Sequence, residues 1–350
     1  MHTRSYFQRS LYGRQHSRKQ GWRLGGFLRR ALLLGSLAIS ALWLWRAWHL
    51  LEKLSEGPTV LQVCRQRLAQ QGVVAERSAS LSGDDVQPVL ARRLLYESLS
   101  LQLTQAGLVL GGEQTQGLDV HTLFKIQSGR PFPILRPLDV PVRAIVLPLT
   151  DSQASRSLHD ALAQHLLPIS QPSGIWLQNP AMYHFTMYHA SHHQRPVPAS
   201  PGEISLEVDA VSAVGSTLCP ISIVLERVVV TSSGNVLACW QVRSGTEPST
   251  IRRVLHKALP KSPPTGQQLG SDPFMLHTTL ARLLQPPSND QPRRLLRQSE
   301  DGAHVLQEAM RAMTQQLCGL QATLSELWFV EEEDLLALAL NGRYRHQRIP

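Results

Sequence analysis

Two short segments of this 350-residue chain place a histidine two positions before a threonine. One segment holds His184 and Thr186, and the other holds His277 and Thr279. Residues two apart on a β-strand project from the same face, so each pair would present an imidazole beside a hydroxyl. Imidazole transfers protons near neutral pH, and a hydroxyl donates hydrogen bonds to phosphoryl oxygens. Two such pairs facing one cleft would suit phosphate chemistry.

A histidine two residues before a threonine or serine is not a specific motif by itself, because the chain holds 14 histidines. A third match, His189-Ala190-Ser191, lies directly after the first segment. His189 lies five residues after His184 and would face the opposite side of a regular strand. A metal site built from His189, His192 and His193 is disfavoured, because no carboxylate or cysteine lies nearby at ligand spacing. We expect a solvated loop at 191–194.

Three more side chains near the motifs have ordinary structural explanations. Arg282 lies five residues after His277, so a regular strand would point it away from the cleft, and we expect a structural ion pair. Trp176 and Tyr183 are able to stack a base, but aromatic residues of this kind are more often part of the core.

The elements that would position His184 form a first lobe. The apolar run at 143–149 predicts a strand, and the residues from Thr150 to Pro168 predict a helix with Leu158 and Leu162 at helical spacing. Prolines and a glycine around 175–177 predict a loop before the His184 strand.

The elements around His277 follow a similar order. The runs at 221–230 and 236–242 predict a hairpin, and 249–259 predicts a helix that Pro260 ends. A linker at 261–270, rich in proline, glycine and glutamine, leads into the His277 strand. A helix therefore precedes the motif strand in both halves, which indicates two lobes of similar design.

The C-terminal part predicts a helix at 303–317 and a strand at 323–331. The acidic residues 331–334 predict a solvated turn. The apolar residues 335–340 fit either an edge strand or a short helix.

The net charge of +9 is concentrated at the N-terminus, since residues 1–30 hold eight Arg and Lys and no acid. The nearly neutral remainder disfavours a basic nucleic-acid-binding body. Residues 31–51 are mostly apolar, with Arg46 as their one Arg, Lys, Asp or Glu, and predict a transmembrane signal-anchor behind a basic cytosolic tail at 1–30. A signal-anchor with this charge distribution predicts a single-pass type II membrane protein, with its body in the lumen of the ER or Golgi. A cleaved signal peptide and an Arg-rich organellar targeting segment are the alternatives.

A helical stem at 52–132 would follow the anchor, with helices at 64–71 and 86–106. The four cysteines, Cys64, Cys219, Cys239 and Cys318, form no CxxC pair. We expect free thiols, or one or two disulfides of open pairing if the body lies in an oxidising lumen.

The segment His184-Phe185-Thr186-Met187 resembles the two-histidine (2H) phosphoesterase superfamily, whose members carry two His-x-Thr/Ser motifs. The segment 276–284, with the flanking residues 176–178, 183–184 and 189–191, resembles its plant-type RNA ligase/cyclic nucleotide phosphodiesterase-like branch. One position departs from the pattern, since Thr278 is polar where the family has a hydrophobic residue. The resemblance implies an α+β fold over 133–350, with two pseudo-symmetric β-sheet lobes around a central cleft.

The resemblance also implies a phosphodiesterase that acts on a cyclic phosphate, of the 2′,3′-cyclic nucleotide or RNA-end type, without a metal or other cofactor. His184 and His277 would be its proton-transfer pair, and Thr186 and Thr279 would bind the phosphate. The alternative is a catalytically inactive, membrane-tethered binding or scaffold protein with the same fold. The sequence contains no GxxxxGK[ST], GxGxxG or GxSxG motif that would favour another enzyme class.

Overall fold

The computed structural model describes residues 59–73, 87–110, 113–115, 118–270, 272–287 and 298–349. The chain divides into two compact units, Met1–Thr59 and Val60–Pro350, and every helix and strand described below belongs to the second. The predicted signal-anchor at 31–51 lies outside the described residues. Within them, no helix is both long and apolar enough to cross a membrane.

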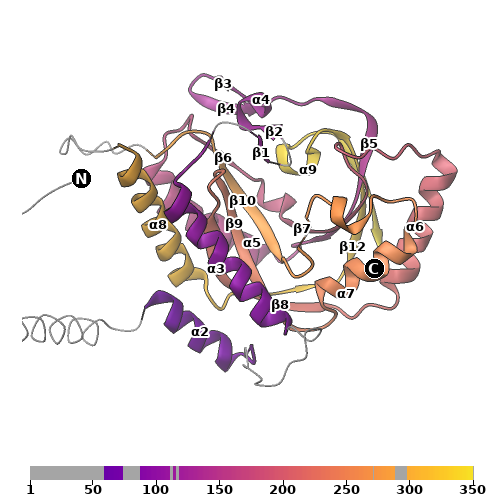
Figure 1. The fold of residues 1–350 in the computed structure, drawn as a ribbon, viewed down its shortest axis with the longest axis horizontal. Coiled ribbons are helices and arrows are strands. Elements are labelled where there is room, and N and C mark those ends of the chain that lie inside the picture. The colour runs from indigo at the N-terminus through magenta and orange to yellow at the C-terminus, as the bar shows by residue number, and fades with distance from the viewer. Residues whose placement is uncertain are drawn as a thin grey trace, which may run out of the picture. The chain divides into compact units, whose positions relative to one another are not determined.

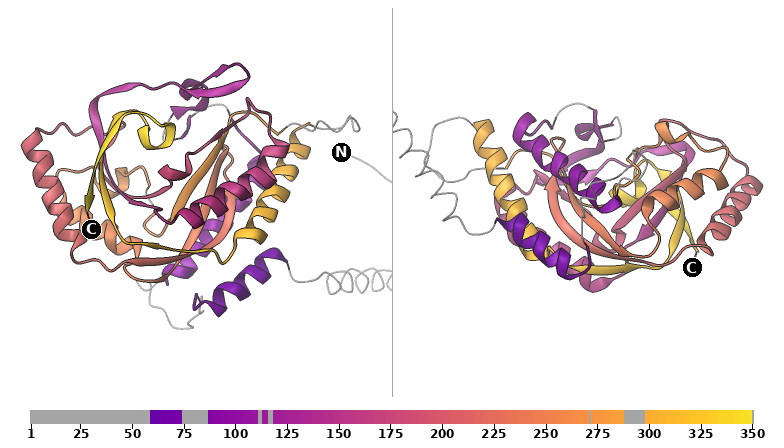
Figure 2. Two further views of the ribbon diagram at one scale, coloured as in Figure 1. Left: turned by 180° about the vertical axis from the view of Figure 1, so that it is seen from behind. Right: turned by 60° about the horizontal axis from the view of Figure 1, so that its bottom comes forward.

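Two antiparallel sheets form the centre of this unit, as Figure 1 shows. The five-stranded sheet has the order β11 (Gln321–Leu324), β8 (Ile221–Val230), β9 (Asn235–Ser244), β10 (His277–Leu283), β6 (Ile175–Leu177). The four-stranded sheet has the order β13 (Tyr344–Ile349), β12 (Leu327–Asp334), β5 (Pro137–Pro148), β7 (His184–Ser191). Both sheets are curved (Figure 2), and with the surrounding helices they confirm the predicted α+β class.

The predicted elements around the two motifs are present, with two differences. The hairpin is β8 and β9, and the helices are α5 (Ser152–Ala161), continued by η1 (Leu162–Leu166) and η2 (Leu167–Ile169), and α7 (Pro248–Ala258). The segment 175–177, predicted to be a loop, is an edge strand because β10 supplies it with a hydrogen-bonding partner. The helix α6 (Pro201–Gly215), which begins at a Ser200–Glu203 capping box, was not predicted.

The C-terminal segment differs more from its prediction. The single strand predicted at 323–331 is two strands, because the chain leaves the five-stranded sheet after β11 and enters the four-stranded sheet as β12. The prediction of a solvated acidic turn at 331–334 is wrong, since these residues are part of β12 and Asp334 is buried and paired with Arg343. Residues Ala337–Leu340 form the short helix α9.

Small elements precede β5 and cover one edge of the unit. They are β1 (Glu113–Thr115), β2 (Leu118–Asp119), α4 (Val120–Leu123), β3 (Phe124–Gln127) and β4 (Arg130–Pro133). Short 3₁₀ turns, η3 (Pro180–Met182) and η4 (Thr265–Gln267), precede β7 and β10.

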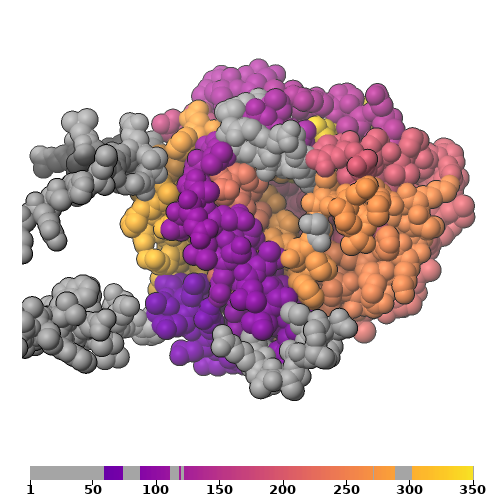
Figure 3. Space-filling model, viewed as in Figure 1, coloured from indigo at the N-terminus to yellow at the C-terminus, as the bar shows by residue number. Residues whose placement is uncertain are grey.

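The helices predicted as a stem are present as α2 (Val60–Gln70) and α3 (Pro88–Ala106), and both pack on the described body. The helix α3 lies across the five-stranded sheet (Figure 1), and its residues are on the face of the molecule that Figure 3 shows. Its Arg92 is fully buried and bonds to Gln241 and Glu247, and its Tyr96 packs among residues of β8 and β9.

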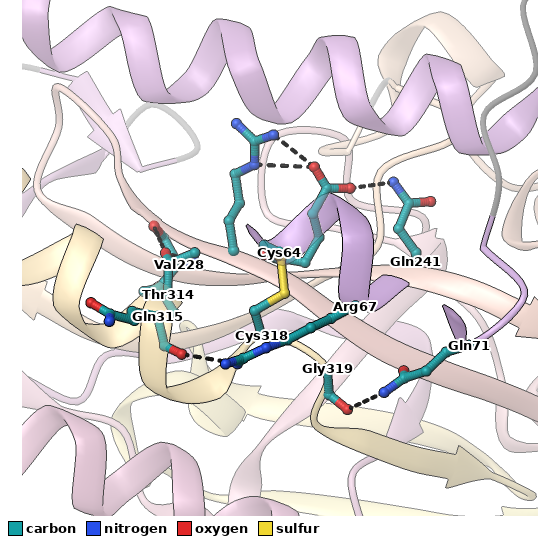
Figure 4. The surroundings of a disulfide bond; sticks show 11 residues. Cys64, Arg67, Gln71, Val228, Gln241, Thr314, Gln315, Cys318 and Gly319 are labelled. Carbon is teal, nitrogen blue, oxygen red and sulfur yellow. Dashed lines mark hydrogen bonds and ion pairs between the residues drawn. A yellow bond between two sulfur atoms is a disulfide. The ribbon is translucent and has the colours of Figure 1, made fainter. Parts of the chain in front are cut away.

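A disulfide between Cys64 and Cys318 joins α2 to the end of α8 (Gln298–Leu317), with the two Cα atoms 5.8 Å apart. Figure 4 shows two hydrogen bonds beside it, from Arg67 to the Gln315 carbonyl and from Gln71 to the Gly319 carbonyl. The other two cysteines are free thiols, with Cys219 exposed and Cys239 buried. Of the disulfides that the four cysteines could form, the structure therefore has one, Cys64–Cys318.

Candidate functional site

One cavity of about 290 Å³ brings the four predicted site residues together. His184 and Thr186 enter it from β7, and His277 and Thr279 enter it from β10. Because β7 belongs to the four-stranded sheet and β10 to the five-stranded sheet, the cavity is lined by both sheets. All four side chains are half-buried. Each pair shares a strand face, as the two-residue spacing predicts.

Both motif strands contain a β-bulge at the same place. On β7 the partners of Ile145 and Val146 are Tyr188 and Thr186, so Met187 is the extra residue. On β10 the partners shift between Thr279 and Ala281, so Leu280 is the extra residue. Each bulge lies three residues after the motif histidine, and the similarity of the two halves extends to this detail.

The bulges overturn the prediction that His189 and Arg282 face away from the cleft. An extra residue shifts the alternation of side chains by one, so a residue five positions after the histidine returns to the histidine's face. Both His189 and Arg282 line the cavity. The guanidinium of Arg282 donates to Asn235 Oδ1 at 3.0 Å, and its burial lowers its pKa to about 10.

His184 is held in one tautomer by the backbone. Its Nδ1 lies 2.8 Å from the carbonyl oxygen of Met182, and since a carbonyl only accepts, Nδ1 carries a hydrogen. Nε2 is then the nitrogen that gains or loses a proton. Burial lowers the pKa of His184 from 6.5, the Met182 carbonyl raises it, and the charge of Arg282 lowers it.

His277 has the lower pKa of the two motif histidines. Burial is the largest cause, followed by the charge of Arg252 and then by His184, and together they lower its pKa to about 4. Both imidazoles line the same cavity. With a pKa of about 4, His277 is a neutral imidazole at pH 7, able to accept a proton.

Arg252 connects the two motif strands and was not found from the sequence. From α7, its guanidinium donates to the carbonyl oxygens of Thr186 and Met187 on β7, at 3.2 Å each. It also donates to those of Pro273, at 2.6 Å, and Met275, at 2.8 Å, just before β10. Nothing in its spacing separates it from the adjacent Arg253, so no sequence signal marked it.

The helix α3 also supports the second motif. The Tyr96 hydroxyl lies 2.8 Å from the Trp240 carbonyl oxygen and 2.9 Å from that of Leu276, the residue before His277. Tyr96 is fully buried, and this raises its pKa well above 10, so the hydroxyl stays protonated and able to donate.

The remaining residues near the motifs have structural surroundings. Tyr183 is in the main core, as predicted, and Trp176 packs against Phe124 and donates to the Ala339 carbonyl. The solvated loop predicted at 191–194 is partly wrong, because Ser191 ends β7 and His192 is buried with its Nε2 at the Gln267 carbonyl. Among the described residues, no group of three or more His, Cys, Asp or Glu is placed to hold a metal ion.

Neither a protein-family model nor a curated protein sequence matches this chain. Among solved structures, the chain is similar to the crystal structure of E. coli LigT in apo form, with 12% sequence identity and a TM-score of 0.35. The similarity covers 61% of this chain and 96% of that one. A similarity of this extent carries no functional conclusion.

Proposed function

We propose that this protein is a phosphodiesterase of the two-histidine superfamily, in its plant-type branch, acting on a cyclic phosphate of the nucleotide or RNA-end type. The observation that supports this most is the meeting of both His-x-Thr pairs in one cavity, from equivalent bulged strands of two sheets. A guanidinium, that of Arg282, lies in the same cavity and favours an anionic ligand.

The two histidines take different roles in this proposal. His277, with its pKa lowered to about 4, is the base that takes a proton from the attacking water. The water oxygen bonds to phosphorus while one phosphorus–ribose oxygen bond breaks. His184, whose imidazolium form the Met182 carbonyl stabilises, gives its Nε2 proton to the departing oxygen. Thr186, Thr279 and Arg282 donate to the non-bridging oxygens, where negative charge develops.

Turnover of 2′,3′-cyclic nucleotides by the full-length protein tests the proposal. Changing either histidine to alanine lowers kcat by about 10²- to 10⁴-fold, the usual contribution of general acid or base catalysis. A matched control is His165→Ala, since His165 is half-buried and contacts Gln316 outside the cavity. If the wild type and both variants are equally inert over a broad panel of cyclic and linear phosphodiesters, the enzyme proposal fails.

The assignment of roles has its own readout. A p-nitrophenyl phosphodiester has a leaving group that needs no protonation, so it restores activity to His184→Ala and not to His277→Ala. The pH profile of kcat/KM follows from the same assignment. The base must be neutral, which requires a pH above about 4, and the acid must be protonated, which requires a pH below its own lowered pKa. The optimum therefore lies on the acidic side of pH 6.5.

One observation favours the inactive binding protein as a second candidate. Burial and the charges of nearby arginines lower the pKa of both motif histidines, so neither is a ready proton donor at pH 7. A bound phosphate would raise both pKa values by offsetting the arginine charges. Binding of a nucleoside 3′-monophosphate by calorimetry, without turnover of any cyclic phosphate from pH 4 to 8, would favour the binding protein.

A further inference from the structure

Glu332 is a cavity residue that the proposed chemistry does not use. It lines the same cavity as the histidines but enters from β12, which lies on the other side of β5 from β7. Its partner on β5 is Val142, whereas the partner of Thr186 is Val146. At about 3.3 Å per residue, these two points are roughly 13 Å apart along β5. A phosphate held by Thr186 would not reach Glu332, but the far end of a nucleotide would.

The carboxyl of Glu332 is buried, and no cation pairs with it in the part of the chain that the structure describes. It is 8% exposed, and among the described residues it accepts one hydrogen bond, from the Leu338 backbone N–H to Oε1 at 2.7 Å. Its neighbours differ, since Glu331 pairs with Arg345 and Asp334 with Arg343. Burial raises the pKa of Glu332 to about 7. A buried acid that the protein leaves unneutralised costs stability, which is expected where a ligand supplies the donors.

A second acceptor lies on the same wall. Gln178 lines the cavity, is 3% exposed, and has its side-chain amide 2.7 Å from the Leu338 carbonyl oxygen. Because a carbonyl only accepts, that contact uses the NH₂ group, and Oε1 is left as an acceptor. The residues between them, Val142 and Ala144 on β5 and Leu338 on α9, are apolar. The wall thus combines apolar surface with acceptors, which suits a flat ring with N–H donors on its edge.

Resting on the proposed function, we infer that this wall binds a guanine base, with the carboxylate of Glu332 accepting from its N1–H and 2-amino groups. Guanine is the base whose Watson–Crick edge offers two adjacent donors. Adenine, cytosine and uracil each set a ring or carbonyl acceptor beside their donor, which a carboxylate would repel. The cavity volume of about 290 Å³ is near the lower end, about 300 Å³, of ligand pockets and suits one nucleotide. The substrate class is then a guanosine 2′,3′-cyclic phosphate or an RNA end terminating in guanosine.

The experiment compares the 2′,3′-cyclic phosphates of guanosine, inosine, adenosine and cytidine with full-length protein. The wild type prefers guanosine, and inosine, which lacks the 2-amino group, is several-fold poorer. Glu332→Gln lowers kcat/KM for guanosine by about 10- to 100-fold, as expected for hydrogen bonds to a charged group. It lowers kcat/KM for inosine, which keeps N1–H, by a smaller factor, and leaves adenosine and cytidine nearly unchanged. The control is Glu331→Gln, the adjacent residue, which pairs with Arg345 and does not line the cavity.

Equal kcat/KM for guanosine and inosine in the wild type overturns the inference, as does an unchanged preference in a folded Glu332→Gln variant. Both outcomes leave the proposed function intact if His184→Ala still abolishes turnover. If the wild type turns over none of the four, the proposed function fails, and calorimetry decides the inference separately. Tighter binding of guanosine 3′-monophosphate than of the inosine and adenosine analogues, lost in Glu332→Gln, supports it, and equal binding overturns it.

Discussion

At the scale of single residues, the motif position that departs from the family pattern has a structural explanation. Thr278 is fully buried between His277 and Thr279, and its hydroxyl has no hydrogen-bond partner among the described residues. Threonine has nearly the shape of valine, so it fills a hydrophobic position at the cost of an unsatisfied hydroxyl. The threonine at position 278 therefore alters only the face of β10 that packs in the core. His277 and Thr279 still share the face that lines the cavity.

Arg252 is the residue whose loss tests how the two motif strands are held together. Arg252→Gln removes a positive charge that lowers the pKa of His277, so that pKa rises from about 4 toward 6.5. It also releases carbonyl oxygens of β7 and of the segment before β10. We expect kcat to fall by about 10-fold or more, since misplacing catalytic groups by about 1 Å costs up to 10²-fold. An NMR titration of the histidine side chains measures the pKa change.

The adjacent Arg253→Gln is the matched control, because Arg253 is exposed on the same helix. It removes the same charge from α7 and should leave both the titration of His277 and kcat unchanged. Equal effects of the two substitutions would contradict the role given to Arg252.

At the scale of elements, sequence patterns predicted what a regular strand or helix determines by itself. The alternation of β7 and β10 placed His184 with Thr186, and His277 with Thr279, on shared faces. The positions of His189 and Arg282 were not predictable, because a bulge is set by pairing with a neighbouring strand and its local sequence looks regular. Tertiary partners likewise decided the acidic segment 331–334, where Arg345 of β13 pairs with Glu331 and Glu333, and Arg343 before β13 pairs with Asp334.

The disulfide between α2 and the end of α8 links two helices, and its contribution to stability can be measured directly. Changing both Cys64 and Cys318 to serine should lower the free energy of unfolding by about 2–4 kcal/mol, the usual range for a native disulfide. Urea denaturation followed by circular dichroism measures the loss. The exposed Cys219→Ser serves as the control. Equal stability of the double variant and the wild type would show that this bond does not form in solution.

At the scale of the whole molecule, the proposed type II anchor at 31–51 and the disulfide lead to the same compartment, because a lumen is oxidising. The prediction is that a C-terminal tag on the full-length protein in intact microsomes resists added protease and is digested once detergent opens the membrane. Digestion without detergent would contradict the lumenal placement. In that case the protein would meet its substrate in another organelle or in the cytosol.

The Cys64–Cys318 bond also determines how the molecule bears force. It spans 254 residues of sequence, so the chain between the two cysteines is a covalent loop closed at its base. A pull between the N-terminal segment and the C-terminus passes through the two sulfur atoms and on into β11 and β12. Both motif strands lie inside the loop, so the covalent path of that pull bypasses them. An intact disulfide would therefore keep β7 and β10 off the covalent path between a tethered N-terminus and the C-terminus.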